Sequence, residues 1–148
     1  MRRTQDLDLL AEALDRAASW LRRTARPTDW NSVAMSTLDA VERTGPLRVS
    51  DLVALEHITQ PGMTGLIARL EAAGLVERGS DPSDGRATLV AITDTGRTYL
   101  REFHAKRAAS IAAHLRTLPA AELEALLGAS DALALLASQP IIGEDPHS

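Results

Sequence analysis

Apolar residues recur every three or four positions along most of this chain, which is the period of one face of an α-helix. The first segment with this pattern has apolar residues at Leu7, Leu10, Leu14, Ala17 and Leu21. Together with candidate N-caps and proline or glycine stops, the period predicts four helices. The first covers residues 6–23, and the second runs from Asp29 or Trp30 to Arg43 with Asp29 as its cap. The third runs from its cap, Thr93, to about Arg116, and the fourth holds Leu123 and continues to about Ala137. The chain is therefore mainly α-helical.

Two shorter helices are predicted in the middle of the chain, over residues 51–56 and 60–73. Ser50 and Thr59 are their candidate N-caps, because a side-chain hydroxyl can accept a hydrogen bond from the first turn. About three residues join the two helices, which is the spacing of a helix-turn-helix. Gly74 is expected to end the second helix in a left-handed conformation. Before the pair, Leu47 to Val49 is long enough only for a strand fragment.

The stretch RGSDPSDGRATLVAITDTGR changes from polar to apolar at Arg86. Residues 75–78 and 87–92 predict an antiparallel hairpin, with the polar segment between them as a long tip. A hairpin directly after a helix-turn-helix is a wing. An arginine near such a tip can enter the minor groove of DNA, and Asp84 can accept a hydrogen bond or ion pair that holds the tip. The alternative is that Arg86 is simply a solvated hairpin residue.

The helix predicted at 60–73 has two unlike faces. The core face carries Met63, Leu66, Ile67 and Leu70. The opposite face is small, with two longer side chains at its edges: Pro61, Thr64, Gly65, Ala68 and Ala72, then Gln60 and Arg69. An unconstrained surface helix usually carries Glu, Lys, Gln and Arg, and a helical glycine costs up to ~1 kcal/mol relative to alanine. A small face suits close approach to the major groove. Packing against another protein helix is the alternative.

Composition limits the other functions. The 148 residues suffice for one domain or for two lobes sharing a core. The formal net charge of −4 taken alone argues mildly against nucleic acid. The sequence has no cysteine, so a thiol nucleophile is not expected. Its four histidines show no close ligand spacing, so a metal site is not expected. A cofactor and an enzymatic activity are not expected either. No signal peptide or membrane-spanning run is indicated, so we expect a cytoplasmic protein.

Several motifs together resemble one known family. They are Ser50-Asp51-Leu52, the run 60–69, Arg69-Leu70-Glu71 with Gly74-Leu75-Val76 and Arg78, Asp81-Pro82-Ser83-Asp84-Gly85-Arg86, and Thr93-Asp94-Thr95-Gly96-Arg97. At this spacing they are similar to the winged helix-turn-helix of MarR-type transcriptional regulators, closely so over residues 47–100. The resemblance implies a homodimer that presents two recognition helices to successive major grooves of a palindromic site in double-stranded DNA.

The resemblance also divides the chain into parts. It implies a single MarR-like domain, 1–148, with a winged helix-turn-helix lobe at 30–100, dimerisation helices at 6–26 and 101–138, and a polar tail at 139–148. Leucines in the first and last helices exceed what one small lobe needs to cover, which agrees with a dimer; packing within the monomer is the alternative. The DNA-binding residues that the resemblance implies are Ser50, Thr59, Gln60, Pro61, Thr64, Gly65, Arg69 and Arg86, with Asp84 stabilising the wing.

Members of this family usually sense a small molecule between the dimerisation helices and the winged lobe. The resemblance therefore implies a small aromatic or phenolic ligand. The large ring side chains expected near that junction are Trp20, Trp30, His57, Tyr99 and His104. For each of them, ordinary packing or exposure to solvent is the alternative.

Two positions depart from the family's pattern. Gly85 stands where the wing often carries a second arginine, so the wing depends on Arg86. His57 lies in the turn where glycine is common, and histidine tolerates the positive φ of such a turn. We expect a ligand-responsive, dimeric repressor. The competing hypothesis is a winged-helix module for protein–protein contact, which the acidic net charge and the single wing arginine favour.

Overall fold

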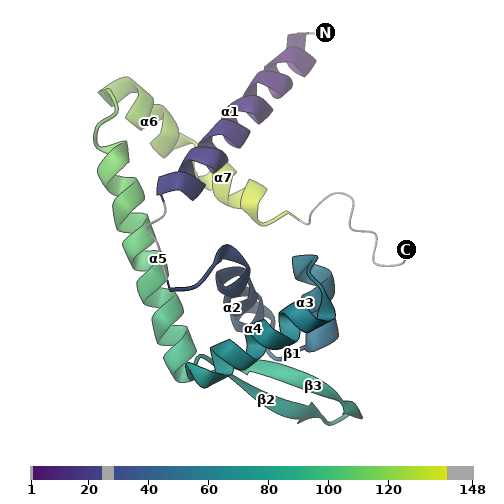
Figure 1. Ribbon diagram of the computed structural model, residues 1–148. Coiled ribbons are helices and arrows are strands. Elements are labelled where there is room, and N and C mark those ends of the chain that lie inside the picture. Colours follow the sequence, from purple (N-terminus) through teal and green to yellow (C-terminus); the bar gives the residue numbers. More distant parts are fainter. Residues whose placement is uncertain (1, 25–28, 140–148) are drawn as a thin grey trace. The chain divides into compact units, whose positions relative to one another are not determined.

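The structure is a computed structural model that describes residues 2–24 and 29–139 (Figure 1). The elements are α1 (Arg2–Thr24), α2 (Ser32–Thr44), β1 (Leu47–Arg48), α3 (Val49–Glu56), α4 (Gln60–Ala72), β2 (Val76–Asp81), β3 (Asp84–Ile92), α5 (Asp94–Leu115), α6 (Ala120–Gly128) and α7 (Ser130–Ala137). The contacts divide the chain into two compact units, Met1–Ala109 and Ser110–Ser148. The fold is mainly helical with one small sheet, as predicted.

The winged lobe is built on a closed aliphatic core. Side chains from α2, α3, α4 and the sheet meet there with almost no exposed area, among them Leu38, Val41, Leu52, Met63, Ile67, Leu70, Val76 and Val90. The predicted core face of α4 is confirmed, because Leu66 is buried as well. This core presses one side of α4 against the lobe and leaves its other side in solvent.

The first helix of the lobe begins later than predicted. Asn31, not Asp29, is the N-cap of α2, and its side-chain oxygen accepts a hydrogen bond from the Ala34 amide at 2.9 Å. An N-cap side chain reaches the amide three residues ahead. In α2 that amide belongs to Ala34, which is three residues after Asn31 and five residues after Asp29.

The cap of α3 also differs from the prediction. This helix begins at Val49 with Arg48 as its N-cap, and the Asp51 carboxylate accepts a hydrogen bond from the Arg48 amide at 3.2 Å. Ser50 therefore lies inside the first turn and caps nothing. Thr59 does cap α4, accepting from the Gly62 amide at 3.2 Å, as predicted.

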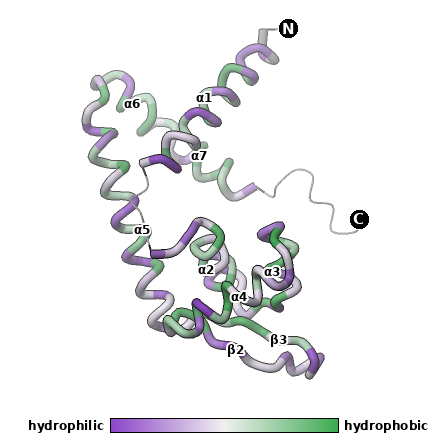
Figure 2. The backbone as a smooth tube through the Cα atoms, viewed as in Figure 1, coloured by the Kyte–Doolittle hydropathy of each residue, from purple (hydrophilic) through white to green (hydrophobic). Residues whose placement is uncertain are grey.

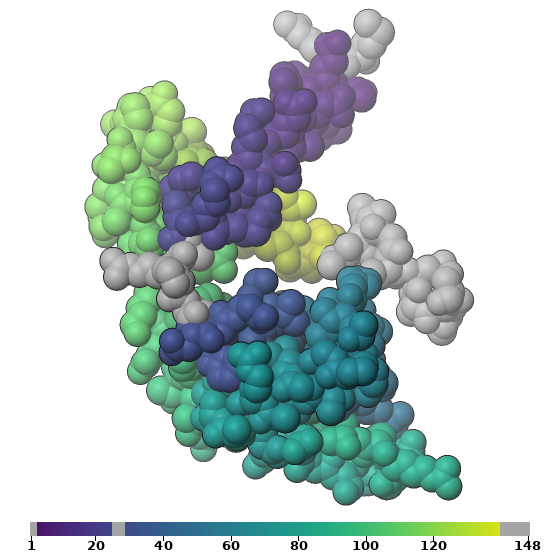
Figure 3. All heavy atoms as spheres, in the orientation of Figure 1, coloured from purple at the N-terminus to yellow at the C-terminus, as the bar shows by residue number. Residues whose placement is uncertain are grey.

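The sheet has the strand order β1-β3-β2 and is antiparallel throughout. The strand fragment predicted at Leu47 is confirmed and pairs with Val90. The hairpin of β2 and β3, here called the wing, projects from the helices of its lobe (Figures 1 and 3). Its tip is much shorter than predicted, because the polar segment continues both strands until Asp81 pairs with Asp84.

An aspartate turn explains the short tip of the wing. The Asp81 carboxylate accepts hydrogen bonds from the Ser83 amide at 2.8 Å and from the Ser83 hydroxyl at 2.7 Å. Aspartate side chains that bond the backbone two residues ahead mimic a backbone turn. Pro82 and Ser83 are consequently enough to reverse the chain.

The start of α5 is fastened to the end of the helix-turn-helix. Thr93 accepts a hydrogen bond from the Gly96 amide at 3.0 Å and donates its hydroxyl to the Gly74 carbonyl at 2.6 Å. Thr93 is thus the cap of the long helix, as predicted, and Gly74 has the predicted left-handed conformation with φ of 73°. One threonine links the stop of α4 to the start of α5.

After Pro119 the described residues form two helices, α6 and α7, where one helix was predicted. The helix ends at Gly128 and a second begins at Ser130, whose hydroxyl donates to the Leu127 carbonyl at 2.8 Å. A serine hydroxyl that bonds the preceding turn competes with helix continuation. Figure 2 shows hydrophobic stretches along α6 and α7, yet no residue of either helix is buried.

Some predicted segments lie outside the described residues. They are residues 25 and 26 of the first dimerisation segment and residues 140–148 of the polar tail. Within the described part of the chain, no helix combines the length and the apolar character needed to cross a membrane.

Candidate nucleic-acid interface

The outer face of α4 is exposed and nearly free of large side chains. All of its predicted residues are exposed: Gln60, Pro61, Thr64, Gly65, Ala68, Arg69 and Ala72. Thr64 donates its hydroxyl to the Gln60 carbonyl at 2.9 Å, so the hydroxyl oxygen remains available to accept from a partner. Around Gly65 there is open space, since an added Cβ would meet nothing within 4 Å. The face is therefore flat at its centre.

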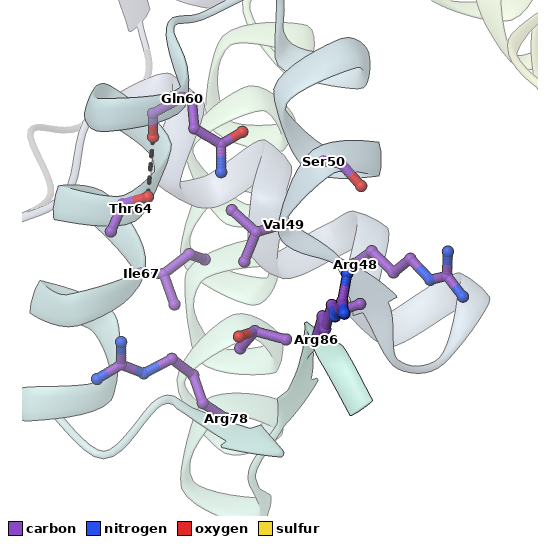
Figure 4. Close-up of a pocket in the computed structure, with 10 residues that line it drawn as sticks. Arg48, Val49, Ser50, Gln60, Thr64, Ile67, Arg78 and Arg86 are labelled. Atoms are coloured by element: carbon purple, nitrogen blue, oxygen red, sulfur yellow. Dashed lines mark hydrogen bonds between the residues drawn. The ribbon is translucent and has the colours of Figure 1, made fainter. Parts of the chain in front are cut away.

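A hollow of about 260 Å³ lies between α4 and the wing (Figure 4). Its lining comes from β1, α3, α4, β2 and β3, namely Arg48, Val49, Ser50, Gln60, Thr64, Ile67, Arg78, Arg86, Ala87 and Thr88. The fold thus brings Ser50, Gln60, Thr64 and Arg86 together around one surface. The other predicted DNA-binding residues, Thr59, Pro61, Gly65 and Arg69, do not line the hollow.

Two arginines of this hollow were missed in the sequence. Arg48 donates through Nε to the Asp81 carboxylate at 2.7 Å, and Arg78 donates through Nε to Glu71 at 2.8 Å. Hydrogen bonding and the charge of these carboxylates raise the pKa of both guanidinium groups. Arg78 stands in the quoted family motif, but nothing local to either arginine indicates that the hollow lies beside it.

Arg86 lies near the tip of the wing with its side chain exposed. The Asp84 carboxylate accepts a hydrogen bond from the Arg86 amide at 3.1 Å and thereby holds the backbone rather than the guanidinium. Among the residues that the structure describes, Arg86 has no carboxylate partner within salt-bridge distance. Its charge is consequently less neutralised than those of Arg48 and Arg78.

Arg69 has a different neighbour. Its guanidinium carbon lies 5.2 Å from the centroid of the Trp30 ring, within the range of a cation–π contact. Arg69 therefore connects α4 to the segment before α2. The guanidinium of this predicted DNA-binding residue therefore already contacts an aromatic ring of the same chain.

The five predicted pocket residues are spread over several elements. Trp20 belongs to α1, Trp30 precedes α2, His57 lies between α3 and α4, and Tyr99 and His104 belong to α5. Trp30 and Tyr99 pack against the core of the lobe, and burial together with Asp29 raises the pKa of Tyr99. His104 Nε2 lies 2.9 Å from the Asp39 carboxylate and so joins α5 to α2. His57 has the predicted positive φ, 50°.

The described residues include no group of three or more histidine, aspartate and glutamate side chains that could hold a metal ion. The chemistry of the surface is that of hydrogen-bond donors and cations. Arginine, glutamine, serine and threonine side chains suit phosphate oxygens and base edges.

The Asp81 turn leads to a prediction on pH. Hydrogen bonds from Ser83, and then the bond and charge of Arg48, lower the pKa of Asp81 to about 2, against an ordinary value of 3.8. A lowered pKa in the folded state stabilises the wing above the unfolded value, and this stabilisation is lost as the pH falls toward 2. We expect the ¹³C shift of the Asp81 carboxyl to titrate with a midpoint near that value. A midpoint at the ordinary value would show that the turn is not formed in solution.

Comparison with known proteins agrees with this geometry. The model of the MarR family matches residues 30–87, the helix-turn-helix and most of the wing. The HTH-type transcriptional regulator Mb0904 of Mycobacterium bovis is 28% identical over 138 residues, which cover 93% of this chain and 94% of that protein. The HTH-type transcriptional repressor NicR of Pseudomonas putida is 29% identical over 92 residues, covering 62% of this chain and 58% of that protein.

A solved structure extends the comparison to the fold. It is that of BpsR from Bordetella bronchiseptica, described as showing a mechanism for regulation of DNA binding by 6-hydroxynicotinic acid. The match has 25% identity and a TM-score of 0.55 and covers 90% of this chain and 93% of the other. The family model matches the lobe that carries the arginine-lined hollow, and relatives match well beyond it, so the winged helix-turn-helix of this chain, residues 30–87, is that of the MarR family of DNA-binding transcriptional regulators.

Proposed function

We propose that the protein is a ligand-responsive repressor that binds a palindromic operator as a homodimer, with α4 in the major groove and the wing at the minor groove. The observation that carries the proposal is the exposed, small outer face of α4 beside the arginines of the hollow. A helix enters the major groove only when its side chains allow close approach, and its N-terminal residues reach the bases. Gln60 and Thr64 are at that end of α4.

The dimer is supported by leucines whose side chains are exposed. Leu7, Leu9 and Leu10 of α1 are exposed, as are Leu126, Leu127, Leu133, Leu135 and Leu136 of α6 and α7. Large exposed apolar patches mark protein–protein contacts. Two copies would bring two DNA-binding surfaces to one site, which offsets the weak footprint expected from a net charge of −4.

A small aromatic compound is the ligand class that we propose. The support is the relative whose DNA binding is described as regulated by 6-hydroxynicotinic acid. Trp20, Trp30, His57, Tyr99 and His104 remain the candidate contacts. A regulator of this kind acts where the chromosome is, so we place the protein in the cytoplasm.

The experiment that tests the function is a binding titration by fluorescence anisotropy. A labelled duplex from the region upstream of the protein's own gene is compared with a duplex of arbitrary sequence at several salt concentrations. We expect tighter binding to the upstream duplex and its release by small aromatic acids. Equal binding to both duplexes at low salt would contradict sequence-specific regulation. If no aromatic acid releases the duplex, the protein is a repressor that does not respond to this class of ligand.

The central glycine of α4 gives a prediction with two opposite readouts. An alanine at Gly65 meets nothing within 4 Å, so Gly65→Ala is expected to raise the free energy of unfolding by about 0.5–1 kcal/mol. The same methyl group stands on the face that we place against DNA, so affinity for the upstream duplex should fall. Urea denaturation and the anisotropy titration measure the two effects. Unchanged or tighter DNA binding would show that this face does not meet the groove.

A further inference from the structure

The hollow between α4 and the wing has a shape that follows from its walls. Gln60, Thr64 and Ile67 line the hollow from α4, and Ala87 and Thr88 line it from β3. Figure 4 shows Arg78 at one end and Arg48 with Arg86 at the other. The surface is therefore a trough with cations at both ends.

The geometry of the duplex says what would lie in such a trough. A major groove and the neighbouring minor groove are separated by one sugar–phosphate strand. This step rests on the proposed function: if α4 enters the first groove and the wing meets the second, that strand must pass between them. The space between them is the hollow of about 260 Å³.

The two missed arginines are placed to bind that strand. The Nε and Nη2 atoms of Arg78 engage Glu71, and those of Arg48 engage Asp81. A guanidinium has five N–H donors, so donors remain on each after its carboxylate is bound. The carboxylates hold the two side chains in one orientation, which reduces the entropy lost when a phosphate binds.

Stability alone does not account for the Arg78–Glu71 pair. The Arg78 side chain is 43% exposed, and exposed ion pairs contribute little to folding. The hollow also carries hydroxyls from Ser50 and Thr88 and the Gln60 amide, groups that commonly bond phosphate oxygens. Cations, hydroxyls and an amide around one trough are the chemistry of a backbone contact.

We propose that this trough seats the sugar–phosphate strand between the two grooves of bound DNA, and that Arg48 and Arg78 are its phosphate-binding residues, held in position by Asp81 and Glu71. The contact carries no base information. It sets the register of α4 and Arg86 on the duplex.

The test is the salt dependence of binding to a duplex of arbitrary sequence. Each phosphate contact contributes about −0.9 to the slope of log K against log salt. Arg78→Ala and Arg48→Ala should each make the slope shallower by about 1.8 for a homodimer, one contact in each copy. Affinity should fall to a similar extent on the upstream duplex and on the arbitrary one.

Arg97→Ala is the matched control. The Arg97 side chain is also 43% exposed and also pairs with a glutamate, Glu42 at 3.0 Å, but it does not line the hollow. Its slope should equal that of the unchanged protein. Glu71→Gln is the second control. If Arg78 has a purely structural role, this variant should lose as much binding as Arg78→Ala. If Arg78 binds phosphate, the variant retains the arginine charge, and its salt slope should equal that of the unchanged protein.

The outcomes separate the two proposals. Unchanged slopes in Arg48→Ala and Arg78→Ala, with a shallower slope in Arg86→Ala, would contradict phosphate binding in the trough and leave the proposed function unaffected. Failure of the unchanged protein to bind any duplex at low salt would overturn both. Competition by inorganic pyrophosphate beyond that of chloride at equal ionic strength, with no slope change in the arginine variants, would assign the trough to free anions and not to the DNA strand.

Discussion

Replacement of Gly96 by alanine is expected to lower the free energy of unfolding by about 3 kcal/mol. An added Cβ would lie 2.0 Å from the Leu75 carbonyl oxygen and 2.7 Å from Cγ1 of Ile92. The oxygen cannot move freely, because it accepts a hydrogen bond from the Thr93 amide at 3.1 Å. The first turn of α5 would have to separate from Leu75, the residue that immediately precedes β2.

Urea denaturation of Gly96→Ala measures this loss, and Gly65→Ala is its matched control. Both add one methyl group to a helical glycine, but the first enters a closed contact and the second meets open space. Opposite signs are therefore expected for the two changes in unfolding free energy. A loss below about 1 kcal/mol for Gly96→Ala would mean that α5 does not pack this closely in solution.

The wing arginine gives the largest expected effect on DNA binding by a single side chain. Arg86→Ala should weaken binding to the upstream duplex by about 1–3 kcal/mol, roughly fivefold to 150-fold. The reason is that the guanidinium near the wing tip is the one in the hollow for which the described residues supply no carboxylate partner. Glu124→Ala, an exposed change on α6, should leave affinity unaltered.

The neighbouring glycine allows the converse experiment. Gly85 does not have a positive φ, and a Cβ added there would meet nothing within 4 Å. Gly85→Arg should therefore fold normally and place a second cation beside Arg86. Tighter binding with a steeper salt slope is expected, along with partial rescue of Arg86→Ala in the double variant. If Gly85→Arg binds no better than the unchanged protein, the wing tip does not approach the duplex.

The helices that were predicted correctly are those whose signals are local. A period of three or four residues identified α1 and the core face of α4. The hydroxyl caps Thr59 and Thr93 identified the starts of α4 and α5, because each bonds an amide three residues ahead. The errors also have local causes. Asn31 and not Asp29 caps α2, and Asp51 and not Ser50 supplies the capping carboxylate of α3. The last predicted helix is interrupted before Ser130, whose hydroxyl bonds the preceding turn.

The wing shows where sequence patterns stop being informative. A run of glycine, proline, serine and aspartate is typical of a loop. Here Asp81 bonds Ser83 and also Arg48, a partner in another strand, so most of that run becomes paired strand. The arginine that orders the tip is far from it in sequence.

The sequence by itself determined the order of the helices, the helix-turn-helix with its wing, the small outer face of α4 and the exposed position of Arg86. These depend on neighbours within a few residues. Only the tertiary structure decided that Arg48 and Arg78 join Gln60, Thr64 and Arg86 around one hollow, and that Arg69 contacts Trp30 instead. Those contacts join elements far apart in the chain, and packing of the shared core, rather than any local pattern, sets the distances between them.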